Sequence, residues 1–115
     1  MSFPTWQQVA NRAAVTVQPT ATVLYGPAQA GQFDDEIYVE VLNDDAVQTA
    51  DCYFQTASAS AGPWRSIGES LVGVPPESKL DDYFKVRGLP WWRVVGQSSG
   101  AGLESRITLR ILRRG

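Results

Sequence analysis

Apolar and polar residues alternate along several short stretches of this chain, with the period of two that is typical of β-strands. The alternation is strictest over Ile37–Leu42 and Ser105–Leu112, where every second residue is Val, Ile or Leu. Further stretches with strand character cover residues 14–17, 20–25, 50–56, 64–67, 80–86 and 91–95. Turn-forming residues separate these stretches. The pattern predicts an all-β fold, a single immunoglobulin-like or jelly-roll β-sandwich of seven or eight short strands.

The alternation also predicts which side chains form the core. One face of the strongest strands carries large apolar residues, and we expect these to point inward together: Val39, Val41, Phe54, Val94, Ile107, Leu109 and Ile111. Cys52 lies on the same side of its strand as Phe54 and is expected to be a small buried residue. Trp91 and Trp92 are adjacent and must face opposite sides of a strand, so one belongs to the core and the other to the surface.

The first residues do not share this pattern. Thr5 and Gln8 have the spacing of a helix capping box, and Trp6, Val9 and Ala10 fall on one helical face. We therefore expect a short N-terminal helix or an extended arm over residues 1–12, followed by a sandwich domain over residues 13–115. Phe3 and Trp6 are aromatic residues near a free end, which favours a contact with a partner.

Two loops carry glycine. Residues 26–35 are expected to form a loop, and residues 96–102 are expected to be the loop of a closing hairpin between the last two strands. The second loop lacks the spacing of a phosphate-binding loop, and a strand follows it where a helix would be required.

The absence of histidine and the presence of a single cysteine limit the kinds of catalytic and metal-binding site that the chain can form. The chain has 115 residues, no histidine and one cysteine. This excludes catalysis through histidine, histidine metal sites and an intrachain disulfide. Paired acids such as Asp44-Asp45 and Asp81-Asp82 lack the spacing of a calcium loop or of a glycosidase pair. We expect no enzyme activity, no cofactor and no metal.

Charge is distributed unevenly along the chain. Residues 1–60 contain seven acids and one base, whereas residues 61–115 contain five acids and nine bases. Opposite charges on neighbouring strands can neutralise each other, or each copy can present an acidic and a basic patch to its neighbours. In the second case the basic patch is Arg110, Arg113 and Arg114, which are expected to contact a partner. The net charge of −2 argues against nucleic acid as a partner. No secretory signal or membrane span is expected.

Several segments resemble a known group of proteins. These are residues 52–56, the Gly62-Pro63-Trp64 turn with residues 65–68, the Trp92-Arg93-Val94-Val95 strand, and the alternating strand of residues 107–111. Together they resemble the small immunoglobulin-like or fibronectin-like β-sandwiches of tailed-bacteriophage virion proteins. In that pattern Trp64 caps the core beside a tight turn.

The resemblance implies a structural virion protein, most directly a capsid decoration (cement) protein that is made in the host cytoplasm and binds the assembled shell. Its implied partners are the major capsid protein or other virion proteins, and neighbouring copies of itself. Trp91 is a further candidate for such a contact. A phage neck or tail component is an alternative, and so is a carbohydrate-binding or adhesion module on the same fold.

Overall fold

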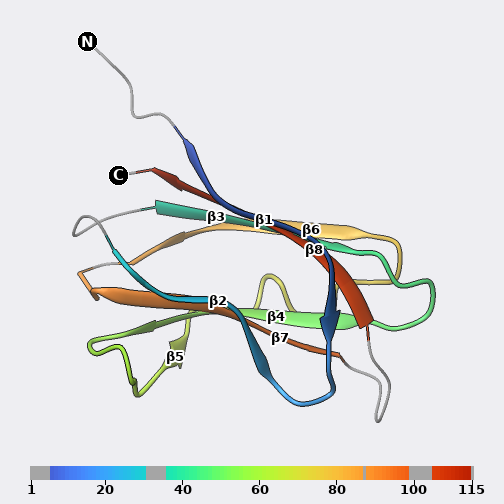
Figure 1. Cartoon of the computed structure of the whole chain (residues 1–115), viewed down its shortest axis with the longest axis horizontal. Coiled ribbons are helices and arrows are strands. Elements are labelled where there is room, and N and C mark those ends of the chain that lie inside the picture. Colours follow the sequence, from blue (N-terminus) through green and yellow to red (C-terminus); the bar gives the residue numbers. More distant parts are fainter. Residues whose placement is uncertain (1–5, 31–35, 87, 99–104, 115) are drawn as a thin grey trace.

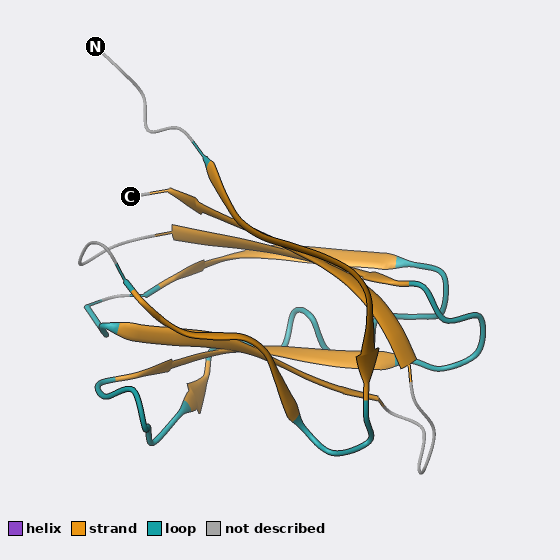
Figure 2. Ribbon diagram, in the orientation of Figure 1, coloured by secondary structure: helices purple, strands orange, loops and turns teal. Residues whose placement is uncertain are grey.

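A computed structural model of the chain describes residues 6–30, 36–86, 88–98 and 105–114. None of these residues is helical (Figure 2). They form eight strands, as the sequence predicts: β1 Gln7–Val17, β2 Thr22–Gln29, β3 Glu36–Asn43, β4 Ala50–Ala57, β5 Arg65–Ser66, β6 Lys79–Lys85, β7 Trp91–Ser98 and β8 Ser105–Arg114 (Figure 1). No described segment is a helix that could cross a membrane.

The strands form two antiparallel sheets that pack face to face (Figure 1). The order in the first sheet is β1-β8-β3-β6, and the order in the second is β2-β7-β4-β5. Most consecutive strands therefore lie in opposite sheets. This is the order of a jelly roll, whereas an immunoglobulin sandwich keeps more sequential neighbours in one sheet. The structure thus has the jelly-roll form of the predicted sandwich.

The core prediction is confirmed. The seven side chains expected to point inward are each at most 1% exposed, and Cys52 is buried with them. Trp92 is the core tryptophan, with 1% exposure, and its ring stacks against Phe54. Phe54 also stacks on Phe84 of the opposite sheet, with ring centroids 4.7 Å apart. These rings join the two sheets across the middle of the sandwich.

Three predictions about local structure are wrong. The helix alternative for the N-terminal segment does not hold over its described residues, because residues 7–17 form strand β1, which pairs with β8 and runs across the expected boundary at residue 12. Residues 26–29 are not loop but the end of β2, where a register shift between Tyr25 and Ala28 includes Gly26 with its positive φ. β7 and β8 do not form a hairpin, because they lie in different sheets.

The free edges of the sheets differ in regularity. On one side of the sandwich, β1 and β2 both contain register shifts, which hinder pairing with another strand. On the other side β5 has only two residues, whereas β6 pairs with β3 over seven residues without interruption. β6 is therefore the longest regular edge strand of the described chain, and it carries Tyr83, an exposed aromatic residue.

Candidate contact surfaces

Three aromatic rings and an arginine gather on the outer face of the first sheet, at the end where β8 finishes. We call Trp6, Tyr38, Tyr83 and Arg114 the aromatic–arginine cluster. Tyr38 on β3 and Tyr83 on β6 are cross-strand neighbours whose ring centroids lie 5.0 Å apart. The ring of Trp6 lies 6.4 Å from that of Tyr38 and 5.7 Å from that of Tyr83. Arg114 places its guanidinium carbon 4.5 Å from the centre of the Trp6 ring.

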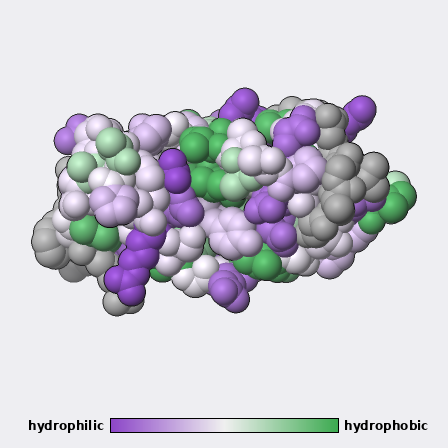
Figure 3. Space-filling model, turned by 90° about the horizontal axis from the view of Figure 1, so that it is seen from below, coloured by the Kyte–Doolittle hydropathy of each residue, from purple (hydrophilic) through white to green (hydrophobic). Residues whose placement is uncertain are grey.

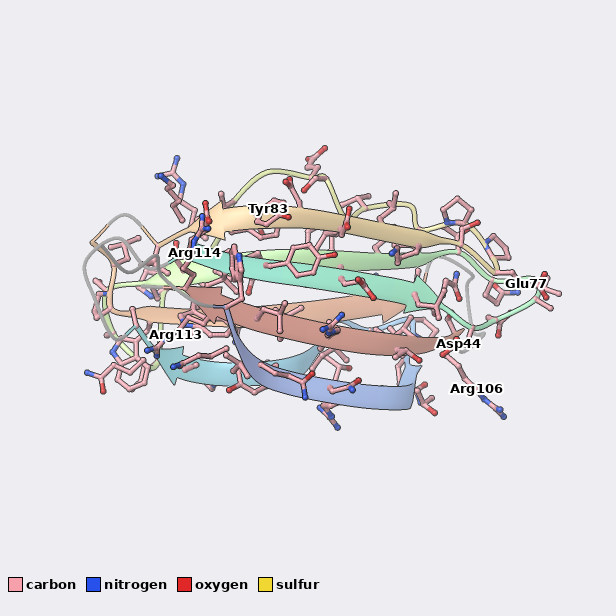
Figure 4. The ribbon with its side chains drawn as sticks, turned by 90° about the horizontal axis from the view of Figure 1, so that it is seen from above. Asp44, Glu77, Tyr83, Arg106, Arg113 and Arg114 are labelled. Atoms are coloured by element: carbon pink, nitrogen blue, oxygen red, sulfur yellow. The ribbon has the colours of Figure 1, made fainter. Side chains whose placement is uncertain are left out.

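The cluster is partly open to solvent. Tyr83 is 58% exposed and has the largest exposed aromatic area among the described residues. It lies on the regular edge strand β6, at the same end of the sheet as Arg114 of β8 (Figure 4). Trp, Tyr and Arg are the residues most enriched at the energetic centres of protein interfaces. The composition and exposure of the cluster therefore fit a protein contact surface.

The hydroxyl group of Tyr38 holds the cluster to the neighbouring acids. Its oxygen lies 2.7 Å from Asp81 Oδ2 and 2.9 Å from Glu40 Oε2, so the single hydroxyl proton is donated to one carboxylate at a time. Burial, followed by these two acceptors, raises the pKa of Tyr38 well above its ordinary value. Tyr38 therefore stays protonated as a hydrogen-bond donor and fixes its ring beside Tyr83.

The charged residues of this face are largely matched across the strands. Arg114 forms an ion pair with Glu36 of β3, and the register places Arg110 directly opposite Glu40. Lys79 lies 3.7 Å from Glu40. This arrangement favours the interpretation in which opposite charges on neighbouring strands neutralise each other. It lowers the net positive charge of the basic patch that the sequence suggested.

The structure brings together some of the contact residues predicted from the sequence and separates others. Trp6 and Arg114 meet in the cluster, and Arg110 is exposed on the same face. Arg113 and Arg114 belong to β8, which extends two residues past the alternating stretch that ends at Leu112. Phe3 lies outside the described residues.

The sequence did not single out Tyr38 and Tyr83. Each lies on the outward side of its strand, between residues that face the core. This alternation could have indicated that both tyrosines lie on the surface.

Trp91 belongs to the second sheet, at the start of β7, where it is partly exposed. Nearby, Trp64 does not cap the core as the resemblance implied. Its ring lies on the outer face, 4.4 Å from the guanidinium carbon of Arg93. The outward direction of Arg93 follows from its neighbours on β7, Trp92 and Val94, which are both buried in the core.

A groove of about 830 Å³ opens between the two sheets, beside the edges of β5 and β6. Its lining includes the apolar residues Ile67, Phe84 and Val86, together with Arg65 and Asp82. The Asp82 carboxylate accepts a hydrogen bond from the backbone N–H of Tyr83 at 2.8 Å. Asp81 instead points to the outer face, where it accepts a hydrogen bond from the Tyr38 hydroxyl. The two adjacent carboxylates therefore lie on opposite faces of the strand and bind different partners. This arrangement is not that of a glycosidase pair.

The two acids that follow β3 accept hydrogen bonds from nearby residues. Asp44 accepts a hydrogen bond from the Thr108 hydroxyl, and Asp45 accepts from the backbone N–H groups of Val47 and Gln48. The backbone hydrogen bonds lower the pKa of the Asp45 carboxyl. In the described part of the chain no three metal-binding side chains come together.

Cys52 is enclosed in the core at 1% exposure. Burial, with a smaller contribution from Asp51, raises the pKa of the Cys52 thiol to about 12. Because the thiolate is the reactive form, this thiol should be inert in the folded chain at neutral pH. We expect a thiol reagent such as DTNB to label Cys52 only when guanidinium unfolds the protein. Rapid labelling at the same pH without denaturant would contradict this assignment.

Comparisons with known proteins bear on the fold. No protein-family profile and no curated protein sequence matches the chain. Among solved structures, it is similar to one described as "Bacillus endospore appendages form a novel family of disulfide-linked pili". The TM-score is 0.57 at 18% sequence identity, over 98% of this chain and 90% of that chain. At this identity the similarity shows a shared fold.

Proposed function

We propose that this protein is a structural protein that acts through protein–protein contacts and without catalysis. The observation that carries the proposal is the aromatic–arginine cluster, in which the ring of the exposed Tyr83 packs against the rings of Trp6 and Tyr38. The rings are held by each other and by hydrogen bonds, so little conformational freedom is lost when a partner binds.

The specific setting we propose is the virion of a tailed bacteriophage, as a capsid decoration protein. The support for this setting is the fold, because jelly rolls are common among viral capsid proteins. The partners are then the major capsid protein or other virion proteins, with neighbouring copies on the shell. The pilus protein of similar fold is also described as a component of an assembly, which supports a structural role in general.

Disulfide linkage does not extend to this chain. The similar structure is described as a disulfide-linked pilus. Here the single cysteine is enclosed in the core and cannot reach another copy while the sandwich is folded. We therefore propose that assembly is non-covalent and rests on surface side chains.

Replacement of Tyr83 by alanine tests the contact surface. We expect Tyr83→Ala to weaken binding to purified shells by about 30-fold, which corresponds to the ~2 kcal/mol effect of an interface hot spot. The fold should survive because Tyr83 is mostly exposed. Binding can be measured by co-sedimentation with shells that lack the protein.

Val47→Ala is the matched control. Val47 is 74% exposed and lies in the loop between β3 and β4, away from the cluster. It should leave binding unchanged. Equal binding by Tyr83→Ala and the parent would exclude the cluster as the contact surface. Binding that a free oligosaccharide competes away would favour the adhesion module instead.

A further inference from the structure

Arg93 occupies an unusual position on the outer face of the second sheet. Its side chain is partly buried, and burial lowers the pKa of its guanidinium group. Among the described residues no carboxylate forms an ion pair with it. A positive charge that has lost part of its hydration without gaining a counter-ion is unfavourable by itself. The guanidinium group of Arg93 therefore carries a charge that no described carboxylate neutralises.

Neighbouring side chains fix the orientation of this guanidinium group. Arg93 Nε donates a hydrogen bond to Gln55 Oε1 at 2.8 Å, and Gln55 Nε2 donates to Ser66 Oγ at 3.1 Å. These residues are cross-strand neighbours on β7, β4 and β5. One face of the guanidinium plane is covered by the Trp64 ring. The two Nη groups remain as donors, and their shared edge matches the two oxygens of a carboxylate.

Apolar and aromatic residues flank Arg93 along its own strand. Trp91 lies two residues before it on β7, and Val95 lies two residues after it, opposite Val23 of β2. Val23 is 39% exposed. Figure 3 shows an apolar area on this face, bordered by polar residues. An arginine within an apolar surround that excludes water is typical of an interface hot spot.

We propose that Arg93 is a second docking point, which binds an Asp or Glu carboxylate of a partner protein. The uncompensated positive charge calls for an acidic partner, and the prearranged Nη edge calls for a planar two-oxygen group. A protein is favoured over an acidic saccharide because Arg93 already covers one face of Trp64, which a sugar ring would use for stacking. This site lies on the sheet opposite the aromatic–arginine cluster, and it does not depend on the function proposed for that cluster.

Titration with small carboxylates tests the proposal on the intact protein. The probe is phenylacetate, which joins a carboxylate to an apolar group, and phenylacetamide is its neutral match. The readout is the ¹⁵Nε–¹Hε NMR resonance of Arg93, with the exposed Arg106 as an internal control. We expect a saturable shift at Arg93 with phenylacetate, at least about tenfold tighter than at Arg106, and no such shift with phenylacetamide.

Other outcomes would overturn the proposal. Equal shifts with the two probes, or equal responses at Arg93 and Arg106, would show that Arg93 is no carboxylate site. Tighter binding of glucuronate than of phenylacetate would assign the face to an acidic saccharide.

Gln55→Ala supplies a second test that keeps the arginine. It releases Arg93 Nε from its acceptor, so we expect several-fold weaker binding of phenylacetate with an unchanged melting temperature. Unchanged affinity in this variant would contradict the prearrangement on which the site depends.

Discussion

Truncation of Leu109 to alanine will lower the free energy of unfolding by about 2–5 kcal/mol, the range for buried leucines. Leu109 is fully buried at the middle of β8, and β8 is hydrogen-bonded on both sides, to β1 and β3. Because its neighbours belong to a regular sheet, they cannot collapse readily into the space that the side chain leaves. Urea unfolding measures the change.

Leu42→Ala is the matched control for this prediction. Leu42 lies on β3 with 36% exposure and points away from the core. Its truncation should cost well under half as much as that of Leu109, because far less apolar area leaves the interior. Similar losses in the two variants would mean that the two faces of the first sheet are wrongly assigned.

Replacement of Asn43 by alanine will lower the free energy of unfolding by about 3 kcal/mol or more, because it leaves several buried groups without partners. Asn43 is fully buried at the end of β3. Its Nδ2 donates to the backbone oxygens of Gln48 at 2.7 Å and Val74 at 3.0 Å. Its Oδ1 accepts from the Asp45 backbone N–H at 3.0 Å and the Ser105 hydroxyl at 3.2 Å.

This single side chain therefore ties the turn after β3 to the loop before β6 and to the start of β8. Thr108→Ala is the control, since it removes one exposed hydrogen bond, to Asp44. It should cost less than about 1 kcal/mol. If Asn43→Ala were as mild as Thr108→Ala, the network would not stabilise the fold.

The sequence predicts individual strands well and their partners poorly. Alternation identifies the inward face of β8 at Ile107, Leu109 and Ile111, because a strand with one buried face must repeat every two residues. It carries no information on which strand lies beside which. The prediction of a closing hairpin was wrong for this reason. β7 and β8 lie in different sheets, and each pairs with earlier strands.

The N-terminal segment shows how tertiary structure overrides a local signal. The spacing of Trp6, Val9 and Ala10 suits a short helix, but such a helix is marginal in water. Pairing with β8, interrupted by two register shifts, gives most of the same residues backbone hydrogen-bond partners, and Val9 and Ala10 pack against the core. The strand therefore replaces the helix.

The candidate surfaces were predictable only in part. The sequence indicated Trp6 and Arg114 separately, as an aromatic residue near one end and a base near the other. Their contact depends on the pairing of β1 with β8, which no local pattern contains. Arg93 was passed over because its lack of a counter-ion becomes visible only when its neighbours on β4 and β5 are placed.

We propose that this protein is a structural component of an assembled particle. Quantitative mass spectrometry of purified phage particles, from the host that carries the gene, tests it most directly. We expect the protein to co-purify with the major capsid protein in a fixed ratio of many copies per particle. Its absence from particles, while it is abundant in the lysate that produced them, would contradict the claim.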